Sequence, residues 1–250
     1  TGYGILGEKQ YLEAAERAVS FLLSTMYDAN SGRLLRRFCE GEAAVPAFLD
    51  DYAFFAQALI DLFEAGFNPS YLEIAANLAK YGLRQFEDSE QGGFFSTAGG
   101  ASDLLLRMKD DYDGAEPSGN SVAADVLLRL AHLTGDSTFR ERAEKCLRWV
   151  APKLEAQPTM APQMLVALGR WLSEPEQIVI RCAEIGSEVE SLLAERRQKF
   201  SPNSVLVVIT DESAGKLAGT APFLAQLERK GRITLYECRN FACELPQVID

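Results

Sequence analysis

The chain has 250 residues, 47% of them hydrophobic, which is enough for one large domain or two modest domains with a real core. Its 25 Lys and Arg residues against 36 Asp and Glu residues give a formal net charge of −11. This charge repels phosphate backbones, and no apolar stretch approaches the ~20 residues of a membrane span, so we expect neither a nucleic-acid partner nor a membrane segment.

Apolar residues recur at helical spacing in six segments of the first 174 residues. Pro residues stand near the start of three of these segments, where their fixed φ suits the first helical turn. The expected helices lie at about residues 8–27 and 50–65, after Asn68-Pro69, from near Pro117, after Gly135-Asp136, and from Pro162.

The connections between these helices alternate in length. Those after the second and fourth helices are tight, at residues 66–68 and 134–136, whereas those after the first and third run to about 20 to 30 residues. Residues 15–37 and 76–97 also form an internal repeat, in which a helix end is followed by an acidic turn and by a Gly before apolar residues. Together these features predict three helical hairpins.

The pattern changes after residue 174. Apolar, β-branched strands are expected at residues 177–182, 204–210 and 232–238, alternating with helices at 187–199 and 221–230. Alternating strands and helices indicate βαβ units, so we expect a three-stranded parallel sheet. The predicted division is therefore residues 1–174 for the hairpins and residues 175–250 for a small α/β unit.

The chain has five cysteines, mostly inside apolar patterns, and an odd number favours reduced thiols in a cytoplasmic protein. Cys238 and Cys243 could bind a metal or form a reversible disulfide, although no second pair completes a zinc site. We expect two free thiols there. The α/β segment lacks G-x-G-x-x-G and a P-loop, so we predict no cofactor and no metal.

Four phrases resemble one known family: FLDDYAFFAQALIDL from Phe48, GGFFST from Gly92, DGAEPSGNSVAA from Asp113 with LLRLAHLTGD after it, and CRNFAC from Cys238. Over nearly the whole chain the sequence resembles the C-terminal part of the spermatogenesis-associated, thioredoxin-domain-containing protein family. The resemblance implies a large protein in which a thioredoxin-like domain precedes an α/α toroid of the six-hairpin glycosidase type. That toroid is similar to N-acylglucosamine 2-epimerase.

This chain departs from that family in two ways. It has no CxxC motif and no thioredoxin domain, so the thioredoxin function does not carry over, and it holds three of six hairpins. We therefore expect a mainly α fold, a partial α/α toroid of three hairpins followed by the α/β unit. The absence of an initial Met also suggests a fragment. Its open edges, with Tyr11, Leu72 and Phe139 as examples, would meet the remaining hairpins of a longer chain or a second copy.

In such a toroid all long loops emerge on one face, where the second and fourth helices begin. Paired carboxylates at a cleft suit acid/base chemistry on sugars, and aromatic side chains stack on sugar rings. The predicted catalytic residues are Asp51, Glu116 and Asp50. The predicted substrate-binding residues are Tyr52, Phe94, Phe95, Tyr112, Asp113, Asn120 and Ser121.

A structural alternative stays open. Asp50 and Asp51 could simply cap the second helix, and Ser118 or Asn120 the fourth, which would make the chain a scaffold that supports a thioredoxin-like domain. His132, the one histidine, is expected near the C-terminus of the fourth helix on the short-loop side, contacting the helix end or the surface. That position argues against epimerase chemistry. The sequence predicts a carbohydrate-related domain and leaves open whether it is an enzyme.

Overall fold

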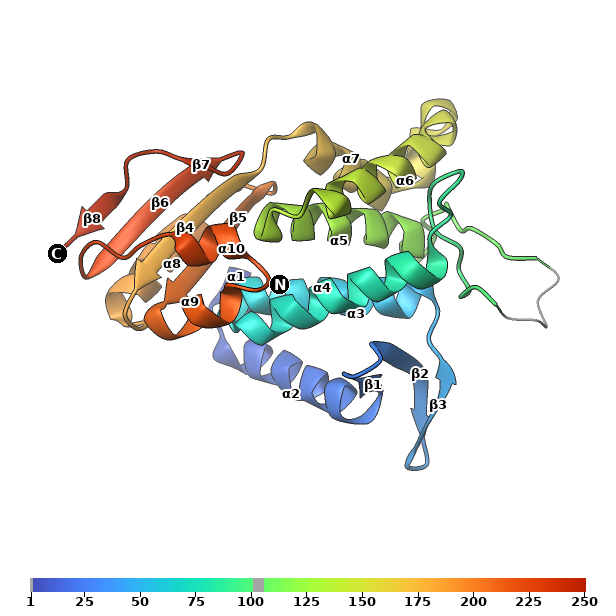
Figure 1. Ribbon diagram of the computed structural model, residues 1–250, viewed down its shortest axis with the longest axis horizontal. Helices are drawn as coiled ribbons and strands as arrows, with labels where there is room; N and C mark the ends of the chain where they lie inside the picture. The colour runs from blue at the N-terminus through green and yellow to red at the C-terminus, as the bar shows by residue number, and fades with distance from the viewer. Residues whose placement is uncertain (1, 101–105) are drawn as a thin grey trace.

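The computed structural model describes residues 2–100 and 106–250, and its helices lie beside a small sheet (Figure 1). The main helices pack against one another in two layers. The inner layer consists of α3 (Leu49–Gly66), α5 (Gly119–Thr134) and α7 (Pro162–Leu172). The outer layer consists of α2 (Lys9–Thr25), α4 (Pro69–Phe86) and α6 (Ser137–Ala156). The six helices predicted from periodicity are therefore present, in the expected order.

The tight connections follow from local backbone chemistry. Phe67 and Gly135 end α3 and α5 in the left-handed region, at φ of 59° and 75°. The side chains of Asn68 and Asp136 then cap α4 and α6 by accepting from backbone N–H groups in the first turn. These caps reverse the chain within a few residues, so α3–α4 and α5–α6 pack as antiparallel neighbours.

The first predicted helix, at about residues 8–27, is present as α2, and a short helix precedes it. Gly7, at φ 73°, separates a short α1 (Gly2–Leu6) from α2. The long connection that follows is also more regular than expected, because it forms the strands β1 (Tyr27–Asp28), β2 (Arg33–Cys39) and β3 (Glu42–Pro46). β2 and β3 pair antiparallel around Glu40 and Gly41, whose φ values of 53° and 83° suit a two-residue hairpin turn.

The C-terminal unit contains β4 (Glu176–Cys182), β5 (Ser204–Thr210), β6 (Ile233–Arg239), β7 (Ala242–Cys243) and β8 (Gln247–Ile249). Its helices are α8 (Ser187–Arg197), α9 (Asp211–Leu217) and α10 (Pro222–Gln226). The strand order is β5-β4-β6-β7, and β8 pairs with β6. β4 and β5 are parallel, but β6 is antiparallel to β4, so the prediction of a parallel sheet is wrong.

The orientation of β6 follows from the short helices before it. A crossover has to travel back along a seven-residue strand of about 23 Å, which takes about 15 helical residues at 1.5 Å each. α9 has 7 residues and α10 has 5. The chain therefore stays at the edge where β5 ends, and Ile233 at the start of β6 lies opposite Cys182 at the end of β4.

The prediction of free thiols at Cys238 and Cys243 is also wrong. The two residues face each other across β6 and β7, with Cα atoms 3.8 Å apart, and form a disulfide. Asn240 and Phe241, both at positive φ, turn the chain between them. The turn brings the two sulfurs together, which the spacing alone could not establish. Cys39, Cys146 and Cys182 are free.

The sheet covers the short-loop end of the helices (Figure 1). Gln177 Nε2 on β4 donates to the carbonyl of His132 at 3.1 Å, and Arg197 Nη2 on α8 donates to the carbonyl of Ala65 at 3.2 Å. The C-terminal unit therefore covers the C-terminal ends of α5 and α3. The long loops lie at the opposite end of these helices. The boundary at residues 174 and 175 stays a prediction, since one hydrophobic core includes residues from both sides of it.

Two of the three apolar side chains that we expected at open edges are buried. Leu72 and Phe139 are fully buried, because α9 and α10 pack against α4 and α5 on that side, whereas Tyr11 is 44% exposed. The helices that flank the open edges expose large apolar side chains: Tyr11 and Phe21 on α2, and Leu165, Val166 and Leu172 on α7. Within the described residues, no helix has both the length and the apolar composition to cross a membrane.

Candidate functional site

The long loops lie at the N-terminal ends of α3 and α5, as predicted, and the second of them also contacts the segment before α7. Leu49 N at the start of α3 donates to the carbonyl of Ser96 at 3.1 Å, which ties the second long loop to α3. Asp113 N donates to the carbonyl of Met160 at 2.9 Å, which ties the same loop to the segment before α7. We call the surface formed here by Asp50, Asp110, Tyr112 and Glu116 the acidic rim.

Asn120 is buried in the first turn of α5 and holds the loop in place. Its Oδ1 accepts from Phe94 N at 2.7 Å, and its Nδ2 donates to the carbonyls of Phe94 at 2.9 Å and of Asp110 at 2.8 Å. All of these partners are backbone groups, so Asn120 positions the loop. Phe94 itself is 3% exposed and belongs to the core.

Asp113 joins two helix starts. Its Oδ1 accepts from Ser118 N at 2.8 Å before α5, and its Oδ2 accepts from Gln163 N at 2.8 Å in the first turn of α7. Ser118 caps α5 by accepting from the backbone N of Ser121, which is fully buried. Ser118 is therefore a helix cap, as the structural alternative predicts. The hydrogen bonds of Asp113 and Ser121 also go to other groups of the protein.

Asp51 and Tyr52 are tied to the hairpin that precedes α3. Asp51 Oδ2 accepts from Phe48 N at 2.8 Å and pairs with Arg36 Nη1 at 3.0 Å. The hydroxyl of Tyr52 accepts from Leu34 N at 2.8 Å, and burial raises the pKa of this phenol. Both side chains thus fix the entry into α3.

Asp50 differs from its neighbour, because its half-buried carboxylate forms no hydrogen bond or ion pair with the described residues. It lies against the first turn of α5, where a side-chain carbon at Gly119 would overlap Asp50 Oδ1. Burial raises the pKa of Asp50, and the negative charges of Asp51 and Asp110 raise it further. The carboxyl of Asp50 therefore keeps its proton to a higher pH than an ordinary Asp does.

The remaining rim residues are exposed. Glu116 faces solvent, and it is close enough to Asp50 for its charge to raise the pKa of that carboxyl. The ring of Tyr112 is 60% exposed and lies beside Gly114. Phe95 is less available than expected, because the guanidinium of Arg107 stands 4.0 Å from its ring centroid.

The acidic rim therefore consists of one half-buried carboxyl, two exposed carboxylates and one exposed aromatic ring. Sequence reasoning did not name Gly119, which lies beside the rim and matters only because α3 and α5 approach closely. Asp110 is held by its carbonyl, which accepts from Asn120 Nδ2. The PSGNS phrase was the available signal for Gly119. Within the described residues, no group of three or more His, Cys, Asp or Glu side chains could hold a metal ion.

His132 lies in the last turn of α5, as predicted, but its side chain is only 1% exposed, so the expected surface position is wrong. β4 covers this end of the helix. Burial and the charges of Arg170 and Arg140 lower the pKa of His132 to about 4, so the ring is neutral at neutral pH and gives the helix C-terminus no positive charge.

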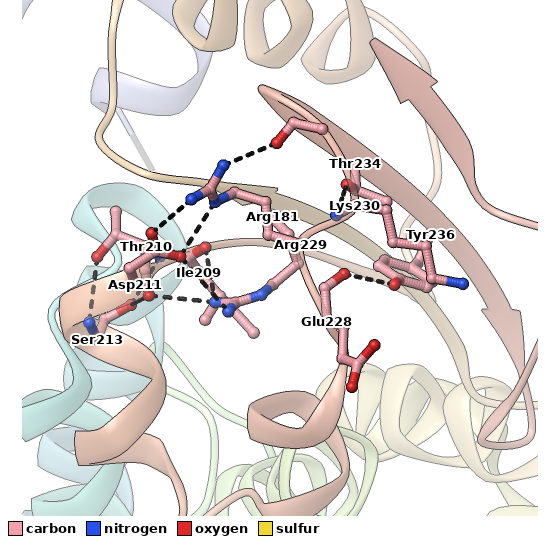
Figure 2. Close-up of polar contacts among 11 residues, drawn as sticks. Arg181, Ile209, Thr210, Asp211, Ser213, Glu228, Arg229, Lys230, Thr234 and Tyr236 are labelled. Atoms are coloured by element: carbon pink, nitrogen blue, oxygen red, sulfur yellow. Dashed lines mark hydrogen bonds and ion pairs between the residues drawn. The ribbon is translucent and has the colours of Figure 1, made fainter. Parts of the chain in front are cut away.

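A second polar cluster lies where the parallel strands β4 and β5 end (Figure 2). Arg181 Nη1 donates to the carbonyls of Ile209 at 3.0 Å and Thr210 at 3.1 Å. Asp211, 3.9 Å from Arg181 Nη2, also pairs with Arg229 at 3.0 Å. The side chains point toward one another, and their contacts stabilise the strand ends, although the buried Nε of Arg181 has no hydrogen-bonding partner among the described residues.

Comparison with known proteins adds two findings. The family model of glycosyl hydrolase family 76 matches residues 32–160, which include the acidic rim. Spermatogenesis-associated protein 20 of Rattus norvegicus is 36% identical over 252 residues, covering 97% of this chain and 32% of that protein. The Homo sapiens protein of the same name is 35% identical with the same coverage. An uncharacterized protein of Caenorhabditis elegans is 32% identical, covering 98% of this chain and 34% of that protein.

The chain is thus homologous to spermatogenesis-associated protein 20 over nearly its whole length, and it spans about a third of the length of these curated relatives. The match to this family agrees with the fold, because the two helical layers correspond to an arc of an α/α toroid.

Proposed function

The chain belongs to glycosyl hydrolase family 76, and we propose that its acidic rim binds a saccharide, with Asp50 donating a proton to a glycosidic oxygen. The observation that carries the proposal is the position of Asp50. This carboxyl is half-buried, has no partner among the described residues, and lies among other acidic groups, which raise its pKa. A carboxyl that stays protonated at a higher pH than usual is suited to general acid catalysis.

The other rim residues have distinct roles in this proposal. Glu116 supplies the second carboxylate, which either attacks the anomeric carbon or removes a proton from water. Tyr112 offers an exposed ring on which a sugar can stack. Asp51, held by Phe48 N and Arg36, places its carboxylate group beside Asp50. Asn120 holds the second long loop in place, and Asp113 holds the starts of α5 and α7 in place.

The test combines binding and turnover on this chain and on the longest native polypeptide that contains it. Calorimetric titration with mono- and oligosaccharides measures binding, and a panel of aryl glycosides measures hydrolysis. Asp50→Asn is expected to lower the rate by about 10²–10⁴-fold, as for loss of a general acid. Glu116→Gln is expected to lower it as well.

The matched control is Glu90→Gln, since Glu90 is exposed in a turn outside the rim. Its substitution should change neither binding nor turnover. Absence of binding across the whole panel, with both proteins folded, would count decisively against a saccharide site.

A specific observation favours a second candidate, the non-catalytic scaffold. Asp51, Tyr52, Asp113, Asn120 and Ser121 all make hydrogen bonds that position the long loops or helix starts. In a scaffold, Asp51→Asn and Glu116→Gln change stability or nothing at all, and every activity of the longer polypeptide persists. Loss of turnover in Asp50→Asn without loss of stability excludes this candidate.

A further inference from the structure

Residues 106–113 of the second long loop lead toward the start of α5, and the exposure of their side chains alternates strictly. Leu106, Met108, Asp110 and Tyr112 are exposed, whereas residues 107, 109, 111 and 113 are half-buried. A period of two is that of an extended chain, in which successive side chains point to opposite sides. The usual pattern is inverted here, because all four half-buried residues are charged and three of the four exposed ones are apolar.

Two of the half-buried charges tie the segment to the end of α4. Arg107 Nη2 donates to the carbonyl of Gln85 at 3.1 Å, and its guanidinium lies over the ring of Phe95. Lys109 Nζ donates to Asp88 Oδ2 at 2.7 Å, in an ion pair whose side chains are only 11% and 12% exposed. The inward side of the segment is therefore fixed by charged groups.

The second half of the segment is held in the same way. Asp111 pairs with Lys153 on α6, and Asp113 accepts from backbone N–H groups at the starts of α5 and α7. The carbonyl of Met108 also accepts from Ser96 N at 2.8 Å. Because the segment is held along its length before a ligand arrives, a ligand that binds to it loses little affinity to ordering the chain.

The outward side of this held segment presents three large apolar side chains. Leu106 is 71% exposed, Met108 63% and Tyr112 60%. We call these three residues the apolar stripe. A single exposed apolar side chain needs no explanation, but several on one side of a fixed segment form a contact surface.

The apolar stripe continues the acidic rim, since Tyr112 belongs to both. Asp110, which lies between Met108 and Tyr112 in the alternation, is close enough to Asp50 for its charge to raise the pKa of that carboxyl. At about 3.3 Å per residue, Leu106 lies about 13 Å along the chain from Asp110. The long-loop end therefore has carboxyl groups at one side and aliphatic side chains at the other.

We propose that the saccharide bound at the acidic rim carries an uncharged alkyl or acyl aglycone, and that this chain lies along the apolar stripe. The inference rests on the saccharide proposal and names its substrate class, a neutral glycolipid. Leu106 and Met108 are aliphatic, so what they gain from a ligand is burial of apolar surface, which CH₂ groups supply.

The charges of the rim favour a neutral ligand. Asp50, Asp110 and Glu116 form no ion pair with the described residues. The nearest cations, Arg36, Lys109 and Lys153, are already paired with other carboxylates. A phosphate or sulfate between the sugar and the chain would meet this negative field without a partner.

Calorimetric titration of the longest native polypeptide that contains this chain tests the proposal. The probes are the methyl, butyl and octyl glycosides of glucose, galactose and mannose, below their micelle-forming concentrations. Full burial of a CH₂ group tightens binding about fourfold, and contact on one side about twofold. We therefore expect octyl glycosides of the preferred sugar to bind about 10-fold or more tighter than butyl glycosides. Octanoate, which has a similar chain and a negative head, is expected to bind at least about 10-fold more weakly than the octyl glycoside.

Variants locate the chain. Met108→Gln and Leu106→Gln should each remove several-fold of the gain from butyl to octyl and leave the affinity for the methyl glycoside unchanged. Both side chains are exposed, so the fold is expected to persist. Leu245→Gln is the matched control, because Leu245 is 95% exposed and follows β7 in the C-terminal unit.

The outcomes separate this inference from the one on which it rests. If no glycoside binds, the saccharide proposal fails and this inference fails with it. If methyl and octyl glycosides bind equally, only the apolar aglycone is excluded. The inference is also overturned if octanoate binds as well as the octyl glycoside, or if Met108→Gln and Leu245→Gln behave alike. A gain seen with the 250-residue chain and lost in the longer polypeptide would show that another part of the protein covers the apolar stripe, which overturns it as well.

Discussion

Asp50 and Asp51 are adjacent in the chain and meet different surroundings. The backbone N of Phe48 and the guanidinium of Arg36 bind Asp51, whereas Asp50 points toward the first turn of α5 without a partner among the described residues. One residue of helix rotation separates a carboxylate that caps α3 from a carboxyl without a partner among the described residues. The sequence alone showed a pair of carboxylates and could not assign these two roles.

The raised pKa of Asp50 makes a prediction about stability. The folded state binds this proton more readily than the unfolded chain, so ionised Asp50 destabilises the fold above its folded pKa. Asp50→Asn should therefore be more stable than the parent at pH 7, on the order of 0.5 kcal/mol after solvent screening. The difference should vanish as the pH falls through the folded pKa of Asp50 toward 3.8. Urea unfolding across this pH range measures it, and a lower stability of the variant at pH 7 would contradict it.

Asn120 carries a second prediction at this scale. Its amide makes three hydrogen bonds to backbone groups, two of them to Phe94, and Ala cannot replace them. Asn120→Ala should lower the free energy of unfolding by about 3 kcal/mol, since buried backbone groups lose their partners. Asn77→Ala on the exposed face of α4 is the control and should cost nothing. Equal melting temperatures of the two variants would show that Asn120 does not organise the loop.

The helices were predictable from the sequence because their apolar periodicity and caps are local signals. The positions of α4, α6 and α7 follow from Asn68-Pro69, Asp136 and Pro162. The orientation of β6 was not predictable, because it depends on where α9 and α10 lie. The β2–β3 hairpin was missed because Glu40 and Gly41 are an unusual pair for such a turn, although its length of two residues was a usable signal.

The β6–β7 hairpin carries a prediction at the scale of elements. The Cys238–Cys243 disulfide joins residues 5 apart, and closing so short a loop stabilises the fold by about 2 kcal/mol. Reduction should lower the free energy of unfolding by that amount in the parent and should have no effect on a Cys238→Ser/Cys243→Ser variant. Thiol titration of the unreduced, denatured chain should give three thiols, Cys39, Cys146 and Cys182. Five titratable thiols would contradict the disulfide.

At the scale of the whole molecule, the helical layers form an open arc. α7 exposes Leu165, Val166 and Leu172, and α2 exposes Tyr11 and Phe21. Within a longer polypeptide, such edges suit contact with further helical hairpins, as for neighbouring units of a repeat array. This chain spans about a third of the length of its curated relatives, which is consistent with that reading.

The open edges predict that the isolated 250-residue chain self-associates. Val166→Lys places a charge on the exposed face of α7 and should shift the population toward monomer, whereas Asn77→Lys on α4 should not. Light scattering as a function of concentration measures both. A parent chain that stays monomeric at high concentration, with no binding of a dye specific for exposed apolar surface, would show that the arc needs no partner.

The central claim is that a saccharide binds at the long-loop end, beside Asp50. Its most direct test is the change in backbone amide signals of the ¹⁵N-labelled chain when the best-bound saccharide of the calorimetric panel is added. We expect the largest changes at Asp50, Tyr112, Glu116 and Gly119, and small changes at the opposite end around His132. Changes confined to the sheet, or none at saturating saccharide, would contradict the account.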